Sequence, residues 1–149
     1  KFRKLETYIH TYQGKIIEVS PETIVPRNYN RFVGLAEQLL LVGRVPPNAE
    51  KPLATILKGT LGELIKEKGV TNVFRLDENG VLIKPREFAK IVIGEGRPAI
   101  IVGAFQRGDF SEEVRHIGAD VYSIFSEALP VWSVVSHIMA LITDEAGVP

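Results

Sequence analysis

The sequence predicts an α/β domain in which helices flank a mostly parallel sheet. From Val73 onward, short apolar runs alternate with short helical patterns, the arrangement that produces parallel strands joined by helices. The run Ala99–Val102 is continuously apolar, as expected for a strand buried on both faces. The length of 149 residues and the 45% hydrophobic and 24% charged content are typical of one globular domain, so we expect a single domain over residues 1–149.

The N-terminal part is predicted to form a hairpin followed by a helix. Two runs rich in β-branched and aromatic residues, 6–11 and 15–19, are separated by a turn that contains glycine. Asn28 or Asn30 can cap the following helix, and Gly43 can end it. The helix is predicted from an apolar stripe at helical spacing, formed by Phe32, Leu35, Leu39 and Val42.

A second helix is predicted over 53–68, although Gly59 and Gly62 weaken it. A strand at 73–76 then precedes the turn signal Asp-Glu-Asn-Gly, which favours Val81–Ile83 as its hairpin partner. The remaining predicted elements are a helix from Pro85 to Ile91, strands at 99–102 and 121–124, a helix from Ser111 to His116, and a last helix that Pro130 opens. The inner face of this last helix is predicted to hold Val131, Val134, Val135, Ile138 and Ile142.

Composition excludes several classes of function. No apolar run reaches the roughly 18 residues that a membrane span requires. The chain has no Cys, and the spacing of its three His residues resembles no metal site, so we expect neither a membrane nor a metal. The 18 basic and 18 acidic residues cancel, which argues against a non-specific nucleic-acid coat. Even so, residues 1–31 hold six basic against three acidic residues, whereas 120–149 hold four acidic and no basic residues.

Three loops follow strand ends, where ligands bind in open α/β sheets. They are the loop after Leu76, the loop Gly103–Asp109 and the loop Phe125–Leu129. Gly103 and Gly108 would let the backbone approach a ligand closely, although a purely structural turn is an alternative. The loop is not a Walker phosphate loop, because no Lys-Ser/Thr pair follows Gly108.

A polar cluster surrounds the start of the first helix. The segment Pro26–Phe32 holds two arginines, two asparagines and a tyrosine. Arg31 and Gln38 are seven residues apart and share a helix face. Arginine recognises phosphates, while asparagine and tyrosine suit exposed bases, so RNA binding is one interpretation. The other is a well-capped helix with solvated arginines.

Taken together, several segments resemble a known family. They are 8–11, 17–21, 25–35 and 38–40, followed by Val102-Gly-Ala-Phe with Gly108-Asp-Phe, and then 123–130. In this order they are similar to the pseudouridine N1-methyltransferases of ribosome biogenesis in archaea and eukaryotes, which belong to the SPOUT superfamily. The archaeal branch is the closer match. The most specific part is Pro26-Arg-x-x-x-Arg-Phe-x-Gly-Leu35.

The resemblance implies a homodimer whose C-terminal part is a trefoil knot that binds S-adenosyl-L-methionine. The knot region would be 73–142, and a segment 20–45 would face small-subunit ribosomal RNA. By position, the implied cofactor-binding residues are Leu76, Gly103, Gly108, Ile124, Phe125, Ser126, Ala128 and Leu129. The implied RNA-binding residues are Arg27, Asn30, Arg31 and Gln38. Part of the last helix, around Val134, Val135, Ile138 and Met139, would pack against the second subunit.

The implied reaction is methyl transfer from a sulfonium to N1 of an unstacked pseudouridine in small-subunit ribosomal RNA. The catalytic residues are unknown, and Asp109 is a candidate base by location alone. Relatives also carry an Arg-Pro-Asp segment that has no counterpart here, so we expect an N-terminal segment to be missing. The location would be cytoplasmic, or nucleolar for a eukaryotic protein.

Two other functions remain open. One is a ribosome-assembly factor that binds RNA and whose catalytic activity is dispensable. The other is a general α/β nucleotide-binding domain without an RNA role.

Overall fold

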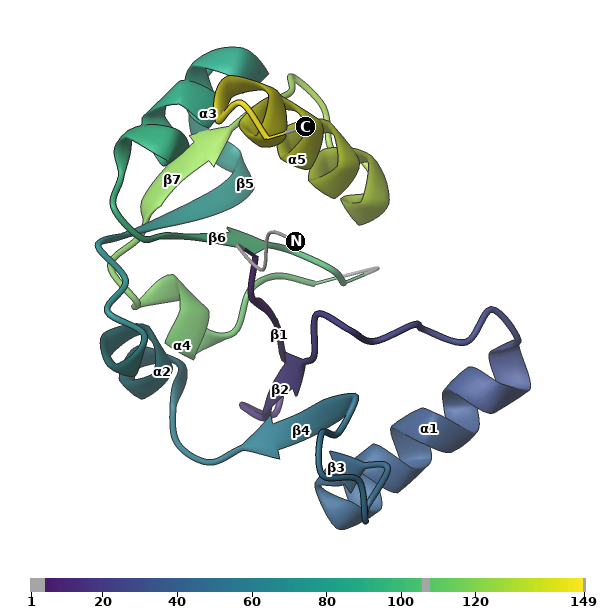
Figure 1. The fold of residues 1–149 in the computed structure, drawn as a ribbon. Helices are drawn as coiled ribbons and strands as arrows, with labels where there is room; N and C mark the ends of the chain where they lie inside the picture. The colour runs from purple at the N-terminus through teal and green to yellow at the C-terminus, as the bar shows by residue number, and fades with distance from the viewer. Residues whose placement is uncertain (1–4, 106–107, 149) are drawn as a thin grey trace. The chain divides into compact units, whose positions relative to one another are not determined.

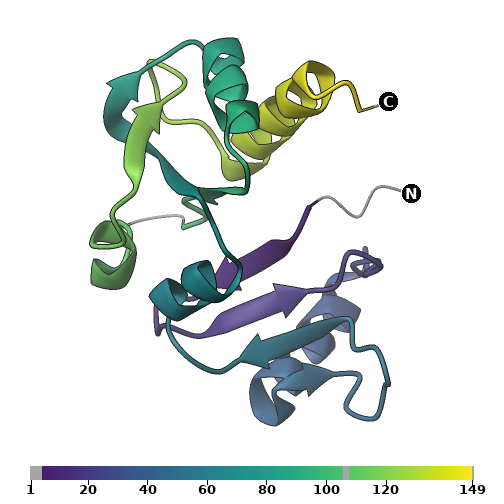
Figure 2. The same cartoon turned by 60° about the vertical axis from the view of Figure 1, so that its left-hand side comes forward.

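The computed structural model describes residues 5–105 and 108–148 and forms two compact units, Lys1–Leu61 and Gly62–Pro149. The first unit is a four-stranded antiparallel sheet in the order β1-β2-β4-β3, with one long helix, α1 (Figures 1 and 2). The strands are β1 (Thr7–His10), β2 (Ile16–Val19), β3 (Arg44–Val45) and β4 (Ala54–Leu57), and the helix is α1 (Tyr29–Val42).

The predicted hairpin and the first helix are confirmed. β1 and β2 pair antiparallel, with Tyr8 opposite Glu18. Asn28, rather than Asn30, caps α1, and its side-chain oxygen accepts a hydrogen bond from the backbone N–H of Arg31. Gly43 ends the helix at a φ of 84°, which glycine adopts without steric cost. Of the predicted apolar stripe, Leu39 is buried together with Ile17 and Val45, whereas Phe32 and Val42 are about half exposed.

The predicted helix over 53–68 is wrong in its first half. Residues 54–57 form β4, which pairs with both β2 and β3, and only α2 (Leu61–Glu67) is helical. Thr55 and Ile56 are β-branched and suit a strand, and Gly59 adopts a φ of 98° that ends any continuous helix. The helical spacing of the apolar residues therefore arose from two separate elements.

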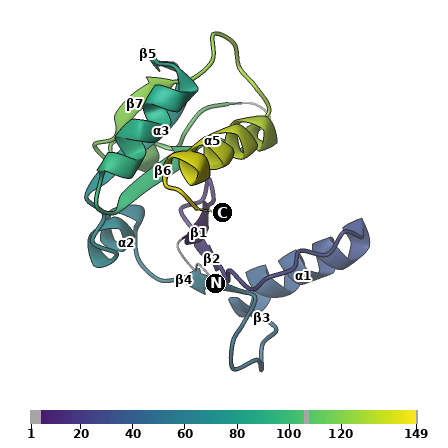
Figure 3. The ribbon, with the colours of Figure 1, turned by 45° about the horizontal axis from the view of Figure 1, so that its top comes forward.

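The second unit confirms the predicted α/β fold with a parallel sheet. Its three strands lie in the order β6-β5-β7 and all run parallel: β5 (Asn72–Leu82), β6 (Pro98–Val102) and β7 (Asp120–Ser123). The helices α3 (Pro85–Gly94) and α5 (Val131–Glu145) pack side by side (Figures 1 and 3), and α4 (Glu112–Arg115) is a single turn. Their common core consists of Phe74, Leu76, Phe88, Val92, Ile124 and Ile138.

Two predictions for this sheet are wrong. Val81 does not form a hairpin, because β5 continues to Leu82 and both Leu76 and Val81 pair with Tyr122 of β7. Residues 77–80 form a bulge in which Asp77 accepts a hydrogen bond from the backbone N–H of Asn79 at 3.0 Å. The strand over 99–102 is half-buried throughout rather than fully buried, because β6 lies at the edge of the sheet.

An exposed ion pair connects the two packed helices of the second unit. The Arg86 guanidinium on α3 lies 2.8 Å from Glu145 and 3.3 Å from Asp144 on α5. The hydrogen bond that Arg86 donates to Glu145, with a second that it donates to Asp144, raises the pKa of Arg86 above its usual value. Within the described residues, no helix has both the length and the apolar content to cross a lipid bilayer.

Candidate cofactor and RNA sites

The three parallel strands approach one edge of the second unit together. β6 ends at Val102, which is in register with Leu76 of β5, and Leu76 is also in register with Tyr122 of β7. The predicted loop after Leu76 is the bulge 77–80 inside β5, which itself ends at Leu82, opposite Ser123, the last residue of β7. This is the edge at which open α/β sheets bind their ligands.

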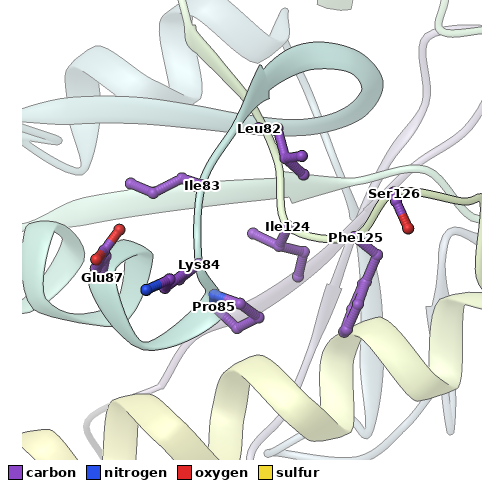
Figure 4. Close-up of a pocket in the computed structure, with 8 residues that line it drawn as sticks. All are labelled: Leu82, Ile83, Lys84, Pro85, Glu87, Ile124, Phe125 and Ser126. Atoms are coloured by element: carbon purple, nitrogen blue, oxygen red, sulfur yellow. The ribbon is translucent and has the colours of Figure 1, made fainter.

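A hollow of about 540 Å³ lies beside the segment that follows β7 (Figure 4). Its volume is within the range of sites for small molecules and cofactors. Two connections form it, one between β5 and α3 and one between β7 and α5. Figure 4 shows Phe125 pointing toward the ribbon of α5 below the hollow. The lining residues are Leu82, Ile83, Lys84, Pro85, Glu87, Ile124, Phe125 and Ser126.

The structure brings three of the eight predicted cofactor residues together at this hollow: Ile124, Phe125 and Ser126. Ile124 and Leu76 are 6% and 7% exposed and belong to the hydrophobic core, so Leu76 could reach a ligand only through its backbone. Ala128 and Leu129 are exposed in the connection to α5.

The described residues of the glycine loop do not line the hollow. Gly103 follows β6, and a Cβ atom there would lie 3.0 Å from the ring of Phe105. Phe105 in turn contacts Phe110 edge-on, with 5.3 Å between the ring centroids. Gly108 has a φ of 100° and open space around it, whereas Gln106 and Arg107 of the predicted loop lie outside the described residues.

Sequence reasoning missed three polar residues near the strand ends. The Ser123 hydroxyl, which is buried, donates a hydrogen bond to the carbonyl of Phe125 at 2.8 Å and so fixes the start of the segment that lines the hollow. Lys84 lines the same hollow. The sequence feature that could have identified it is its position directly before Pro85, which opens α3. Arg75 lies 3.6 Å from Asp77 and interrupts an otherwise apolar strand pattern.

The Arg75 guanidinium also faces the ring of Phe110, with 5.3 Å between its central carbon and the ring centroid. Both side chains of the Arg75–Asp77 pair are 14% exposed. The Arg75 side chain therefore connects the middle of β5 with the segment that follows the glycine loop.

Asp109, the candidate base by location, is held by an ion pair. Its carboxylate lies 3.0 Å from the Arg115 guanidinium and accepts a hydrogen bond from the backbone N–H of Phe110. Ser111 caps α4, and its side-chain oxygen accepts a hydrogen bond from the backbone N–H of Val114. His116 Nδ1 lies 2.7 Å from the carbonyl oxygen of Glu112. Among the described residues, no three His, Asp or Glu side chains come close enough to hold a metal ion.

The predicted RNA-binding residues lie in the first unit, at the start and along one flank of α1. Arg27, Asn30, Arg31 and Gln38 are all exposed. Asn28 is occupied in capping the helix. The first turn of α1 holds no acidic residue that would repel a phosphate.

The two units carry opposite charge by sequence. Residues 1–61 hold nine Lys and Arg residues against five Asp and Glu residues, whereas 62–149 hold nine against thirteen. Lys1, Arg3 and Lys4 of the basic set lie outside the described residues. The neutral total thus combines a basic unit, which carries the RNA-binding candidates, with an acidic unit that contains the hollow.

Known proteins resemble this chain over most of its length. The sequence profile of the family described as EMG1/NEP1 methyltransferase matches residues 1–142. The chain is 42% identical over 135 residues to a ribosomal RNA small subunit methyltransferase Nep1 of Staphylothermus marinus, covering 91% of this chain and 58% of that protein. It is 42% identical over 146 residues to the Nep1 of Sulfurisphaera tokodaii, covering 98% and 64%. The chain thus spans only 58% and 64% of the length of these two curated relatives.

A solved structure shows the same relationship. The crystal structure of Archaeoglobus fulgidus Nep1 bound to S-adenosylhomocysteine matches with a TM-score of 0.80 and 31% sequence identity. The match covers 98% of this chain and 64% of that one.

Proposed function

We propose that this chain, which belongs to the EMG1/NEP1 methyltransferase family, acts in methylation of small-subunit ribosomal RNA with S-adenosyl-L-methionine as methyl donor. The target atom is N1 of a pseudouridine. One observation carries the proposal: the family profile spans both the exposed arginine cluster at α1 and the ligand-sized hollow beside β7.

The residues around the hollow fit S-adenosyl-L-methionine by their chemistry. Ile124 and Phe125 provide apolar walls for an adenine or a thioether, and Ser126 and Lys84 provide polar groups at the rim. When bound, this cofactor supplies an electrophilic methyl group on a sulfonium. The hydroxyl of Ser123 keeps the lining segment in shape through the carbonyl of Phe125.

The protein's contribution to the reaction is alignment. The bond from sulfur to the methyl carbon breaks as the bond from N1 to that carbon forms, and the N1 proton passes to a base or to water. Asp109 is held by the Arg115 guanidinium at 3.0 Å, and we assign no residue as the base. Arg27 and Arg31 would bind phosphates and hold the RNA while the target base leaves its stack.

The proposal includes the organisation of the chain. Residues 20–45 would face the RNA, and 73–142 would form the cofactor-binding trefoil knot of a single methyltransferase domain. The parallel order β6-β5-β7 supports the α/β part of this assignment, and the knot itself rests on the family resemblance. An experimental structure whose backbone path contains no trefoil knot would contradict this part of the proposal.

We also propose a homodimer formed through α5. Ile138, which was predicted to contact the second subunit, packs in the core of the second unit instead. The contact would therefore use exposed apolar residues near the start of α5. The exposed apolar residues are Leu129, Trp132 and Val135, at 43%, 71% and 40% exposure. Trp132 is the single tryptophan, so dimer dissociation on dilution should shift its fluorescence to longer wavelength. Sedimentation that shows a stable monomer at micromolar concentration would contradict the dimer.

Calorimetric titration of the full-length protein with S-adenosyl-L-methionine tests the cofactor assignment. We expect saturable binding, and a Phe125→Ala variant should weaken it because an apolar wall is lost. Absence of binding at millimolar cofactor would contradict the assignment. RNA binding is tested separately with the Arg27→Ala/Arg31→Ala double variant, whose affinity for a small-subunit ribosomal RNA fragment should fall and depend less on salt.

A further inference from the structure

We propose that the Tyr29 side chain stacks on an unpaired base of the bound RNA. This inference rests on the proposed RNA methyltransferase function and extends it, because it adds a base-contacting residue to a set of phosphate-binding arginines. The ring would recognise the face of a base, which every nucleotide offers, rather than its hydrogen-bonding edge.

Tyr29 is an exposed aromatic residue without an internal role. It is the first residue of α1, its side chain is 77% exposed, and its hydroxyl makes no hydrogen bond to any of the described residues. The residues just before the cap are also exposed and apolar, with Ile24 at 87% and Val25 at 56%. Large apolar side chains displayed together on a polar segment are typical of a contact surface.

Hydrogen bonds tie down the backbone on both sides of Tyr29. Asn28 accepts a hydrogen bond from the backbone N–H of Arg31 through its side chain at 3.1 Å, and its carbonyl accepts one from Phe32 at 3.0 Å. Further upstream, the Thr23 hydroxyl donates to the carbonyl of Leu53 at 2.7 Å and anchors the connection to the sheet. A ring presented from such a fixed turn loses little conformational entropy when it binds.

The charge around Tyr29 favours RNA over an apolar protein partner. Arg27 precedes it by two residues, Arg31 follows it by two, and all three side chains are exposed. Two residues correspond to about 200° around a helix, so Tyr29 and Arg31 project from opposite flanks of α1. A single strand that crosses the start of the helix therefore meets Arg27, which lies before the helix, rather than Arg31, and can place a phosphate on Arg27 and a base on Tyr29. Alternating basic and aromatic residues of this kind form the usual surface for single-stranded RNA.

The chain offers a matched control. Tyr12 lies in the turn between β1 and β2 of the same unit and is 83% exposed, slightly more than Tyr29. No arginine lies within five residues of Tyr12 in the sequence. Tyr12→Ala therefore removes an equally exposed aromatic ring from a place where we expect no stacked base.

The test measures binding of the full-length protein to a small-subunit ribosomal RNA fragment that contains the target pseudouridine, by fluorescence anisotropy. Tyr29→Ala should raise the Kd about tenfold or more, because the stacked base loses its aromatic partner. Tyr29→Phe should bind like the wild type, whereas Tyr29→Leu, which has no π-face, should bind like Tyr29→Ala. Tyr12→Ala should leave the Kd unchanged.

Salt dependence separates stacking from phosphate binding. Arg27→Ala should reduce the slope of log K against log salt by about one, whereas Tyr29→Ala should leave it unchanged. Wild-type binding by Tyr29→Leu, which would indicate a purely apolar contact such as a protein partner makes, would overturn the inference. The inference would also be overturned if Tyr29→Ala left the Kd unchanged while Arg27→Ala raised it. That result would leave the proposed function intact. A wild-type protein that does not bind the RNA would instead contradict the proposed function itself.

Discussion

Gly80 is the position at which a single methyl group should disturb the sheet beside the hollow most strongly. A Cβ atom at Gly80 would lie 2.5 Å from the carbonyl carbon of Tyr122 and 2.8 Å from its Cα and N atoms. Carbon atoms in contact are normally about 3.5–4.0 Å apart, so β7 must move by about 1 Å. All three atoms belong to the backbone, so no rotation of a side chain can relieve the clash.

We therefore expect Gly80→Ala to lower the free energy of unfolding by about 3 kcal/mol, the upper end of the usual cost of overpacking. For a chain of this length, that corresponds to a fall in Tm of roughly 6–12 °C. The displaced strand leads directly into Ile124, so affinity for S-adenosyl-L-methionine should fall as well.

Urea and thermal unfolding followed by far-UV circular dichroism measure the loss of stability, and calorimetry measures the affinity. Gly94→Ala is the matched control, because a Cβ atom there meets nothing within 4 Å. A Gly80→Ala protein within about 0.5 kcal/mol of the wild type would refute the close approach of β5 and β7 at this point.

Three further substitutions test other parts of the structure. Leu39→Ala removes a side chain that is 7% exposed and should lower the free energy of unfolding by about 2–5 kcal/mol. Leu41→Ala removes a side chain that is 86% exposed and should leave the free energy of unfolding almost unchanged. Equal losses of stability would contradict the orientation of α1. Ser123→Ala removes the donor to the carbonyl of Phe125, so it should lower the free energy of unfolding by about 1–2 kcal/mol and weaken cofactor binding. If neither stability nor cofactor affinity changes, the positioning role of Ser123 is contradicted. Arg86→Ala should lower Tm slightly at low salt and not at high salt. The pKa of Arg86 is raised in the folded protein, so Arg86 stays charged at every pH below its pKa in the unfolded chain. The fall in Tm caused by Arg86→Ala should therefore be the same at every pH between about pH 6 and pH 9. A fall in Tm that disappears within that range would contradict the ion pair.

Local signals were sufficient where one short segment determines its own structure. The αL glycine at Gly43 was predicted as the end of α1, and the start was narrowed to a cap at Asn28 or Asn30, of which the structure shows Asn28. The parallel sheet was also predictable, because its strands alternate with helices in sequence.

Long-range pairing explains the two main errors. Residues 54–57 are a strand because β2 and β3 pair with it on both sides, and no helical pattern within the segment reveals those partners. Val81 lies beside β7, roughly forty residues away, although the turn signal before it favoured a local hairpin.

The candidate site was predictable only in part. The family resemblance, confirmed by the profile over residues 1–142, identified the segment 124–126 that lines the hollow. It did not identify Lys84, because Lys84 comes from the connection between β5 and α3. It did not identify Ser123 as a site residue, because Ser123 acts on the backbone carbonyl of Phe125. Side chains that act through packing or through the backbone leave little trace in a sequence motif.

The most direct test of the central claim is to identify the methylated product. The full-length protein is incubated with S-adenosyl-L-methionine and a small-subunit ribosomal RNA fragment, and nucleosides from the digested RNA are analysed by mass spectrometry. We expect N1-methylpseudouridine from RNA that carries pseudouridine at the target position, and no methylated product when uridine replaces it. Unmodified pseudouridine in the presence of bound cofactor, or equal methylation of the uridine RNA, would contradict this expectation.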